Sequence, residues 1–428
     1  MQTKEEKALF YKTTILIGLG FFTMGLMDPL YDAFVPLFLK EYINSKTIIG
    51  SIMTLDNIFA LFLIPIVSAI SDRTRTSIGR RMPYILVTLP MSAIFFSMIP
   101  YAALRSLAWL ILTLFLLNIF KQAARGPVVA LMPDIVHPDY RSEANGVINF
   151  MGGIAAIVGT VGLSKLMDLN INLPIIGNTK DKLPFLISGF LVIFATILLF
   201  LFVKEKYKAE NEIEEKVPIL KSFKMIFSDE DKSAVLILFS LFLWFFGYQG
   251  VLPFVTTYAV EIIGVSKGTA GISPGMVAIP YALFAIPSGI IAHKIGRKKM
   301  IRICLIGLIV AMILMFLHKP MVDTFKLSQS ISLIFFWAIL FFFGIFWGSV
   351  VTNSFPMLWQ MATYTNMGIY TGLYYTFSQS AAIFSPPVTG ALIDLINIRA
   401  IFLFAAICMG GAFILMGFVK KGEPTSHK

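Results

Sequence analysis

The stretch SDRTRTSIGRRMPYI, from Ser71 to Ile85, places four arginines and one aspartate between two long apolar runs. A shorter version, HKIGRKKM, returns at 293–300. Both stretches contain a glycine, Gly79 and Gly296, that allows a tight turn. A basic turn that recurs between apolar runs predicts pairs of membrane helices whose connections lie at one face of the bilayer.

The composition of the whole chain agrees with a membrane protein. Of its 428 residues 57% are hydrophobic and 14% are charged, whereas a soluble domain carries about 25% charged residues. The net charge of +11 comes from cations in short loops, which favours orientation in a membrane over nucleic-acid binding. Cys304 and Cys408 lie inside apolar runs and cannot form a disulfide framework or a metal site, so we expect no cofactor and no metal.

Twelve apolar runs are long enough to cross a bilayer as helices, and they lack the alternation of barrel strands. They are 13–38, 47–71, 83–104, 106–133, 142–168, 182–203, 233–262, 271–293, 301–319, 329–355, 368–394 and 400–419. The predicted fold is an all-α membrane protein with twelve transmembrane helices in two six-helix bundles. We expect an N-terminal bundle at 1–203, a cytoplasmic linker at 204–232, and a C-terminal bundle with a short tail at 233–428.

The loop charges predict the orientation of the chain. If both termini are cytoplasmic, the inner segments hold more than twice as many lysines and arginines as the outer ones. The N-terminal apolar run is too long for the core of a cleavable signal. We therefore expect a multi-pass protein of the inner, or plasma, membrane with both termini inside.

The two halves of the chain also repeat. A shift of 226 residues superposes 127–168 on 353–394 and brings Asp168 onto Asp394. Repeats with equal topology imply two bundles related by an axis along the membrane normal. This architecture predicts a substrate cavity between the halves, near the middle of the membrane.

The basic turns are candidate gates on the cytoplasmic side. Arginines near Asp72 could pair with it and hold one conformation, although plain anchoring of the loops is the alternative interpretation. The candidate gate residues are Asp72, Arg73, Gly79, Arg80, Arg81, Gly296, Arg297 and Lys298.

An aspartate, a glycine and a basic cluster after the second and eighth spans resemble the loop signature of the major facilitator superfamily. Two stretches narrow the resemblance. PIV at 65–67, SDR at 71–73 and GRRMPYI at 79–85 are similar to the sucrose transporters and the glycoside–pentoside–hexuronide cation symporters, as is GPVVALMPD at 126–134. The resemblance implies proton-coupled uptake of a disaccharide or another glycoside.

Several positions depart from the patterns of these families. His293 stands where the second gate usually has an acid, and Val129 replaces an arginine for which Arg125 could substitute. The acid of the fourth helix is Asn118 here. The paired acids of the melibiose-type cation site are Ala60 and Ile64, which argues against a sodium site of that type.

Ionisable residues inside spans are costly and are therefore functional candidates. We expect Asp28, Asp32 and Asp56 to serve proton coupling. Asp28 and Asp32 are four apart on one helical face, and two acids this close in a low dielectric cannot easily both ionise. At about 1.5 Å per residue, Asp28, Asp56 and Lys121 fall at similar depths. The alternative is a static ion pair that fixes helix packing.

The candidate substrate-binding residues carry amide, phenol or cationic groups that could bond sugar hydroxyls, with packing as the alternative role. They are Asn57, Lys121, Arg125, Asn145, Asn149, Tyr248, Gln249, Asn353, Tyr370, Tyr374, Tyr375 and Gln379. Glu261 and Asp394 lie near the outer ends of their helices, where we expect them to be solvated.

No phosphate-binding loop, metal-ligand cluster or catalytic constellation is found, so the sequence does not predict an enzyme. The leading hypothesis is a monomeric sugar–proton symporter that works by alternating access in the lipid bilayer. A proton-coupled exporter of drugs or metabolites is the first alternative. A non-transporting sugar sensor is the second.

Overall fold

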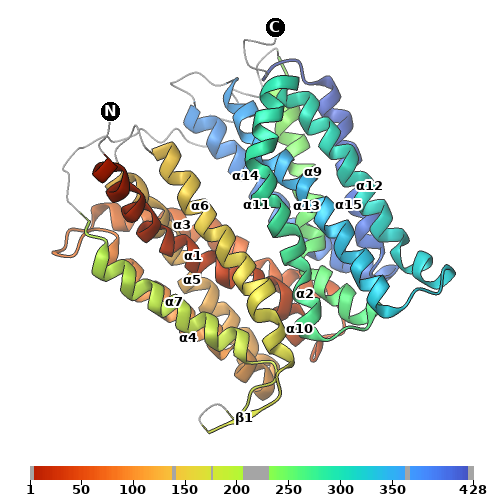
Figure 1. Ribbon diagram of the computed structural model, residues 1–428, viewed down its shortest axis with the longest axis horizontal. Coiled ribbons are helices and arrows are strands. Elements are labelled where there is room, and N and C mark those ends of the chain that lie inside the picture. The colour runs from red at the N-terminus through yellow and green to blue at the C-terminus, as the bar shows by residue number, and fades with distance from the viewer. Residues whose placement is uncertain (1–3, 137–140, 175–176, 206–230, 362–366, 423–428) are drawn as a thin grey trace. The chain divides into compact units, whose positions relative to one another are not determined.

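A computed structural model describes residues 4–136, 141–174, 177–205, 231–361 and 367–422, which are almost entirely helical (Figure 1). Most of the expected linker, 206–230, lies outside the described residues. The elements of the first half are α1 (Lys4–Lys40), α2 (Lys46–Met53), α3 (Leu55–Arg73), α4 (Met82–Arg105), α5 (Leu107–Ile135), α6 (Arg141–Ile157), the π-helix η2 (Val158–Leu163), the 3₁₀-helix η3 (Ser164–Asp168), β1 (Asn172–Leu173), β2 (Gly177–Asn178) and α7 (Leu183–Phe202).

The second half contains α9 (Ser233–Tyr258), the π-helix η4 (Ala259–Ile263), α10 (Lys267–Ala270), α11 (Ser273–Ile295), α12 (Arg297–Thr324), α13 (Gln329–Trp359), α14 (Met367–Leu395) and α15 (Ala400–Phe418). Strands β1 and β2 form a small antiparallel pair with Leu173 opposite Gly177.

The expected membrane class is confirmed. Within the described residues, eleven helical segments are long and apolar enough to cross a bilayer. The expected span at 368–394, which is α14, is helical over 29 residues but is not among them. Its first half is rich in tyrosine, threonine, serine and glutamine, which lowers its hydropathy.

The chain forms two compact units, and each takes a short piece from the other half of the sequence. Unit 1 comprises Met1–Tyr42, Leu55–Glu210 and Ser266–Gly275. Unit 2 comprises Ile43–Thr54, Asn211–Val265 and Met276–Lys428. The expected second span is therefore divided between α2, in unit 2, and α3, in unit 1, with the break at Thr54.

Close backbone approach holds α1 beside α6 in unit 1 (Figure 1). A Cβ atom on Gly25 would lie only 2.2 Å from the carbonyl oxygen of Gly152, so a larger residue would push the two helices apart. Small residues at helix contacts are the usual means of packing inside membranes, where lipid removes the hydrophobic drive between helices.

In unit 2, the N-terminus of α2 is bound by the carboxylate of Asp394 at the end of α14. Asp394 accepts hydrogen bonds from the backbone N–H groups of Lys46 at 2.8 Å and Thr47 at 2.9 Å. The hydroxyls of Ser45 and Thr47 donate to it as well, each at 2.7 Å. A carboxylate here satisfies N–H groups that have no partner within the helix and complements the helix dipole.

Unit 1 contains the matching arrangement at α10. Asp168 accepts a hydrogen bond from the Ser266 hydroxyl at 2.6 Å and another from the Gly268 N–H at 3.1 Å. These two aspartates are the ones that the internal repeat superposes. Asp394 is exposed, as expected for a solvated acid, and it also binds a helix end, which the sequence analysis did not anticipate.

The lysine at each short helix also pairs with an acid in its own unit. Lys46 Nζ lies 3.1 Å from Glu261, another residue that was expected to be solvated. Lys267 Nζ lies 3.0 Å from Glu41 and 3.3 Å from Asp181. The aspartate and the lysine together fix each short helix in place.

We expect Asp394→Ala to lower the free energy of unfolding by about 2 kcal/mol, because it leaves the first N–H groups of α2 without their acceptor. Thermal unfolding of the purified protein in detergent measures this loss. Asp323→Ala is the control, since its exposed pair with Lys319 should contribute only about 0.5 kcal/mol. Equal losses in the two variants would contradict the capping role of Asp394.

Candidate functional site: a charged cluster in the interior of unit 1

Three helices of unit 1 bring opposite charges together inside the bundle. Lys121 of α5 is 4% exposed, and its ammonium lies 2.9 Å from Asp28 Oδ1 of α1 and 3.9 Å from Asp56 Oδ2 of α3. The side chains of Asp28 and Asp56 are 34% and 20% exposed. Two of the predicted proton-coupling acids thus share one predicted cation.

Polar neighbours orient this cluster. The backbone N–H of Asn57 and its side-chain amide both donate to Asp56 Oδ1, at 2.6 and 2.8 Å. The Lys121 ammonium lies 4.8 Å from the centre of the Tyr31 ring, a distance at which the ring face attracts a cation. Asn118 donates to the Tyr31 hydroxyl at 3.1 Å, which holds that ring in place.

The sequence prediction missed part of the polar face of α5. Asn118, Lys121, Gln122 and Arg125 recur at helical spacing, and this spacing is the signal that would have identified Gln122. The side-chain oxygens of Asn118 and Gln122 are buried without a hydrogen-bond partner in the described part of the chain. Buried acceptors of this kind can accept a hydrogen bond from a hydroxyl group or a water molecule.

Asp32 and Arg125 lie in the same region without a direct ion pair to a described residue. Asp32 is partly buried one turn after Asp28, close enough for its charge to act on Lys121. Arg125 is exposed one turn after Lys121, and its charge acts on both Asp28 and Asp56.

The charges of this group do not cancel when all its members are ionised. Asp28, Asp32 and Asp56 supply three negative charges, and Lys121 and Arg125 supply two positive ones. One proton on a carboxylate makes the group neutral, and a neutral group costs least in a low dielectric. With all members ionised, the group carries one negative charge in excess.

The basic turn between α3 and α4 forms a second charged network in unit 1. The buried Arg81 pairs with Asp72, donates to Asp134 Oδ2 at 2.9 Å and donates to the Ser71 hydroxyl at 2.5 Å. Arg80 also pairs with Asp134. The exposed Arg73 makes no ion pair with a described residue.

Glu205 caps the start of α4, a role that the sequence analysis missed. Its carboxylate accepts the Arg81 N–H at 3.0 Å and the Met82 N–H at 3.3 Å. Gly79 has a φ of 112°, and a Cβ atom there would lie 2.1 Å from this carboxylate. All these partners belong to unit 1, so the network ties helix ends within a single unit.

The repeated turn at Gly296, with a φ of 92°, is bonded differently. Arg297 donates to the Pro356 carbonyl at 3.3 Å. Lys298 donates to the carbonyls of Gly417 at 2.9 Å and Val419 at 2.6 Å, which closes the end of α15. The second copy thus binds backbone carbonyls in unit 2 where the first binds carboxylates.

Among the predicted sugar-binding residues of unit 2, two buried ones are bonded to other protein groups, Asn353 within α13 and Tyr374 across to α13. Asn353 donates to the Ser349 carbonyl at 2.8 Å, and the hydroxyls of Tyr374 and Ser354 bond at 3.2 Å. Tyr370 is buried, whereas Gln249 and Gln379 are partly exposed. Tyr375 is 56% exposed.

Asn145 and Asn149 of α6, in unit 1, are exposed and bonded to each other, with Asn149 donating to Asn145 Oδ1 at 3.0 Å.

Tyr248 belongs to a stack of aromatic rings that the sequence analysis did not anticipate. Its ring centre lies 4.2 Å from Trp347, and the two planes differ by 22°. Phe343 extends the stack at 6.0 Å from Tyr248. Trp347 and Phe343 lie one helical turn apart on α13, a spacing that is visible in the sequence. Trp347 and Phe343 are buried, and Tyr248 is the partly exposed member of the stack.

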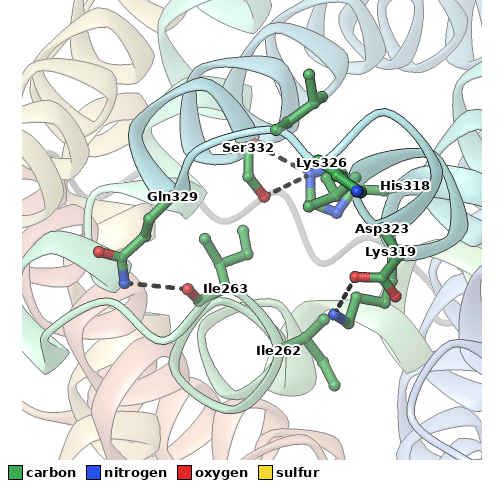
Figure 2. A pocket seen from close by; sticks show the side chains of 10 residues that line it. Ile262, Ile263, His318, Lys319, Asp323, Lys326, Gln329 and Ser332 are labelled. Carbon is green, nitrogen blue, oxygen red and sulfur yellow. Dashed lines mark hydrogen bonds and ion pairs between the residues drawn. The ribbon is translucent and has the colours of Figure 1, made fainter.

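A cavity of about 430 Å³ in unit 2 lies apart from these residues (Figure 2). It is lined by the ends of η4 and α12 and the start of α13, and none of the predicted substrate residues lines it. His318 contacts the Tyr258 hydroxyl at 3.0 Å and the Ser332 carbonyl at 3.0 Å. Since a carbonyl only accepts, His318 Nε2 carries the proton. Among the described residues, no cluster of His, Cys, Asp or Glu could hold a metal ion.

Comparison with known proteins identifies the family. The profile of the Major Facilitator Superfamily matches residues 17–380 and 237–428. A search of curated protein sequences finds no match. The chain therefore belongs to the major facilitator superfamily, and it is a multi-pass membrane transporter rather than an enzyme.

Solved structures support the fold. A mutant of the nucleoside transporter NupG matches with a TM-score of 0.74 at 14% identity, covering 95% of this chain and 100% of that chain. The D-xylose-proton symporter gives 0.70 at 13%, covering 97% and 98%. An inward-facing, occupied bacterial homolog of the human lysosomal transporter Spinster gives 0.65 at 14%, covering 98% and 95%.

Lys121→Met should destabilise the protein by about 1–3 kcal/mol, because it leaves partly buried carboxylates without their cation. The double variant Lys121→Met with Asp28→Asn should recover a large part of this loss, since the pair is then removed together. Chemical unfolding in detergent measures both values. If the two changes simply add, Lys121 and Asp28 are not energetically coupled.

Proposed function

We propose that this transporter carries out proton-coupled symport of a disaccharide or a related glycoside by alternating access. The observation that carries the proposal is the charge imbalance of the unit 1 cluster, in which three carboxylates face two cations. In this proposal the exchangeable proton resides on Asp32, because Lys121 already pairs with Asp28 and Asp56.

The proposed coupling follows from the cost of charge in the membrane interior. With the proton bound, the cluster is neutral and can be enclosed away from water. Loss of the proton leaves one net negative charge, which favours an open, hydrated state. Movement of a proton down its gradient would thereby drive the conformational cycle.

A saccharide suits the groups available in each unit. The partly exposed carboxylates of Asp28 and Asp56 can accept hydrogen bonds from sugar hydroxyls, and the partly exposed Tyr248 ring can bind the C–H face of a sugar ring. Two structural neighbours are a nucleoside transporter and a D-xylose-proton symporter, which is consistent with a polar, ring-shaped substrate. The PIV, SDR and GPVVALMPD stretches favour the sucrose-type group within the superfamily.

The proposal also includes the oligomeric state, the membrane and the cytoplasmic gate. We infer a monomer in the inner, or plasma, membrane with both termini cytoplasmic, as the loop cations predict. The Asp72–Arg81–Asp134 network is the proposed cytoplasmic gate element.

A proton-coupled exporter is the second candidate, because the partly exposed Tyr248 ring also suits planar apolar solutes.

Asp32→Asn should abolish accumulation driven by a pH gradient in proteoliposomes while preserving exchange of labelled solute, because the amide mimics a permanently protonated acid. Asp28→Asn should impair both activities, because it removes the partner of Lys121. Asp323→Asn is the matched control and should leave uptake unchanged. Full accumulation by Asp32→Asn would contradict the assigned proton site.

The same vesicles can identify the class of solute. We expect unlabelled disaccharides to compete for uptake and planar cationic drugs to have no effect. Tyr248→Ala should raise the KM by about tenfold, whereas Tyr248→Phe should retain most of the stacking. Competition by drugs but by no saccharide would favour the exporter.

A further inference from the structure

A second cavity in unit 2 lies where α12 begins and α15 ends. It has a volume of about 390 Å³ and is lined by Lys298, Lys299, Arg302, Ile303, Ile306 and Phe413. Three of these six residues are cations, and none carries a carboxylate. The loop charges predict that this end of α12 is cytoplasmic.

The cations of this pocket are held in different ways. Lys298 binds the last carbonyls of α15, as described above, whereas Lys299 is exposed. The Arg302 guanidinium carbon lies 4.5 Å from the centre of the Phe413 ring. Arg302 Nε is buried without a hydrogen-bond partner in the described part of the chain.

An apolar strip continues from the cations along the same face of α12. Lys299, Arg302, Ile303 and Ile306 follow the spacing of one helical face. Ile303 and Ile306 are 47% and 49% exposed in a helix that is long and apolar enough to cross the membrane. The site is thus cationic at the end of the helix and apolar toward its middle.

We propose that this pocket binds the headgroup of a phosphate-bearing anionic phospholipid, with its acyl chains along Ile303 and Ile306. Basic pockets between membrane helices on the cytoplasmic side suit such headgroups. A free phosphate shares the headgroup chemistry, but it would make no use of the apolar strip. This site is independent of the proposed proton and sugar chemistry, whose residues do not line it.

The cavity of Figure 2 provides a matched control at the other end of α12. It is similar in size, at about 430 Å³, and it contains two lysines, Lys319 and Lys326. Lys319 is paired with Asp323 at 2.5 Å, and the lining includes Gln329 and Ser332. Its cations are therefore partly neutralised, and we expect no preference for anionic lipid there.

Native mass spectrometry of the purified full-length protein tests the site with phosphatidylglycerol and phosphatidylcholine of equal chain length. We expect phosphatidylglycerol to bind about 30-fold more tightly, since two cations at the surface each contribute about fivefold. The double variant K299Q/R302Q should lose this preference. The control K319Q/K326Q should keep it, and R302K should retain most of it.

Two kinds of result would overturn the proposed lipid site. An equal preference in K299Q/R302Q and the parent protein, or no preference in either, overturns the site. Displacement of phosphatidylglycerol by inorganic phosphate at equal concentration would leave an anion site and overturn the lipid as its source. Thermal unfolding of each variant checks that it is folded. K299Q alone, at an exposed position, should still reduce the preference for phosphatidylglycerol about fivefold.

Discussion

The attraction between Lys121 and two aspartates is the constraint on which the interior of unit 1 depends. An ammonium group cannot remain charged in a low dielectric without partners. Asp28 and Asp56 supply them from α1 and α3, and Tyr31 adds its ring face. Because these groups come from three helices, the same contact that keeps the charge tolerable also fixes how the helices lie. A change in the charge of any of these groups would therefore act on the packing of the bundle.

The same demand for partners shapes the helix ends. Asp394 and Asp168 accept the first N–H groups of α2 and α10, and Glu205 accepts those of α4. Conversely, Lys298 donates hydrogen bonds to the carbonyls at the end of α15. Charged side chains at these ends complete hydrogen bonds that neither the helix nor lipid can supply.

The membrane-helical class could be predicted from the sequence, because long apolar runs with charged turns have few other folds available. The superfamily was expected from the resemblance of the turn at Asp72–Arg81 to its loop signature. The grouping of Asp28, Asp56 and Lys121 could also be predicted, since the cost of buried charge and the count of residues to each helix end restrict their partners. The partners of Asp394 could not be predicted, because water would satisfy an acid at a helix end equally well. The Tyr248–Trp347 stack depends on helix rotation, which hydropathy does not specify.

The division of the second span at Thr54, together with the transfer of 266–275 to unit 1, has a consequence for biogenesis. Residues of the N-terminal half emerge from the ribosome first, yet unit 1 lacks one of its pieces until residue 275 has been synthesised. Unit 2 in turn needs 43–54, which are made long before the rest of it. Each unit is therefore complete only when residues from both halves of the sequence are present.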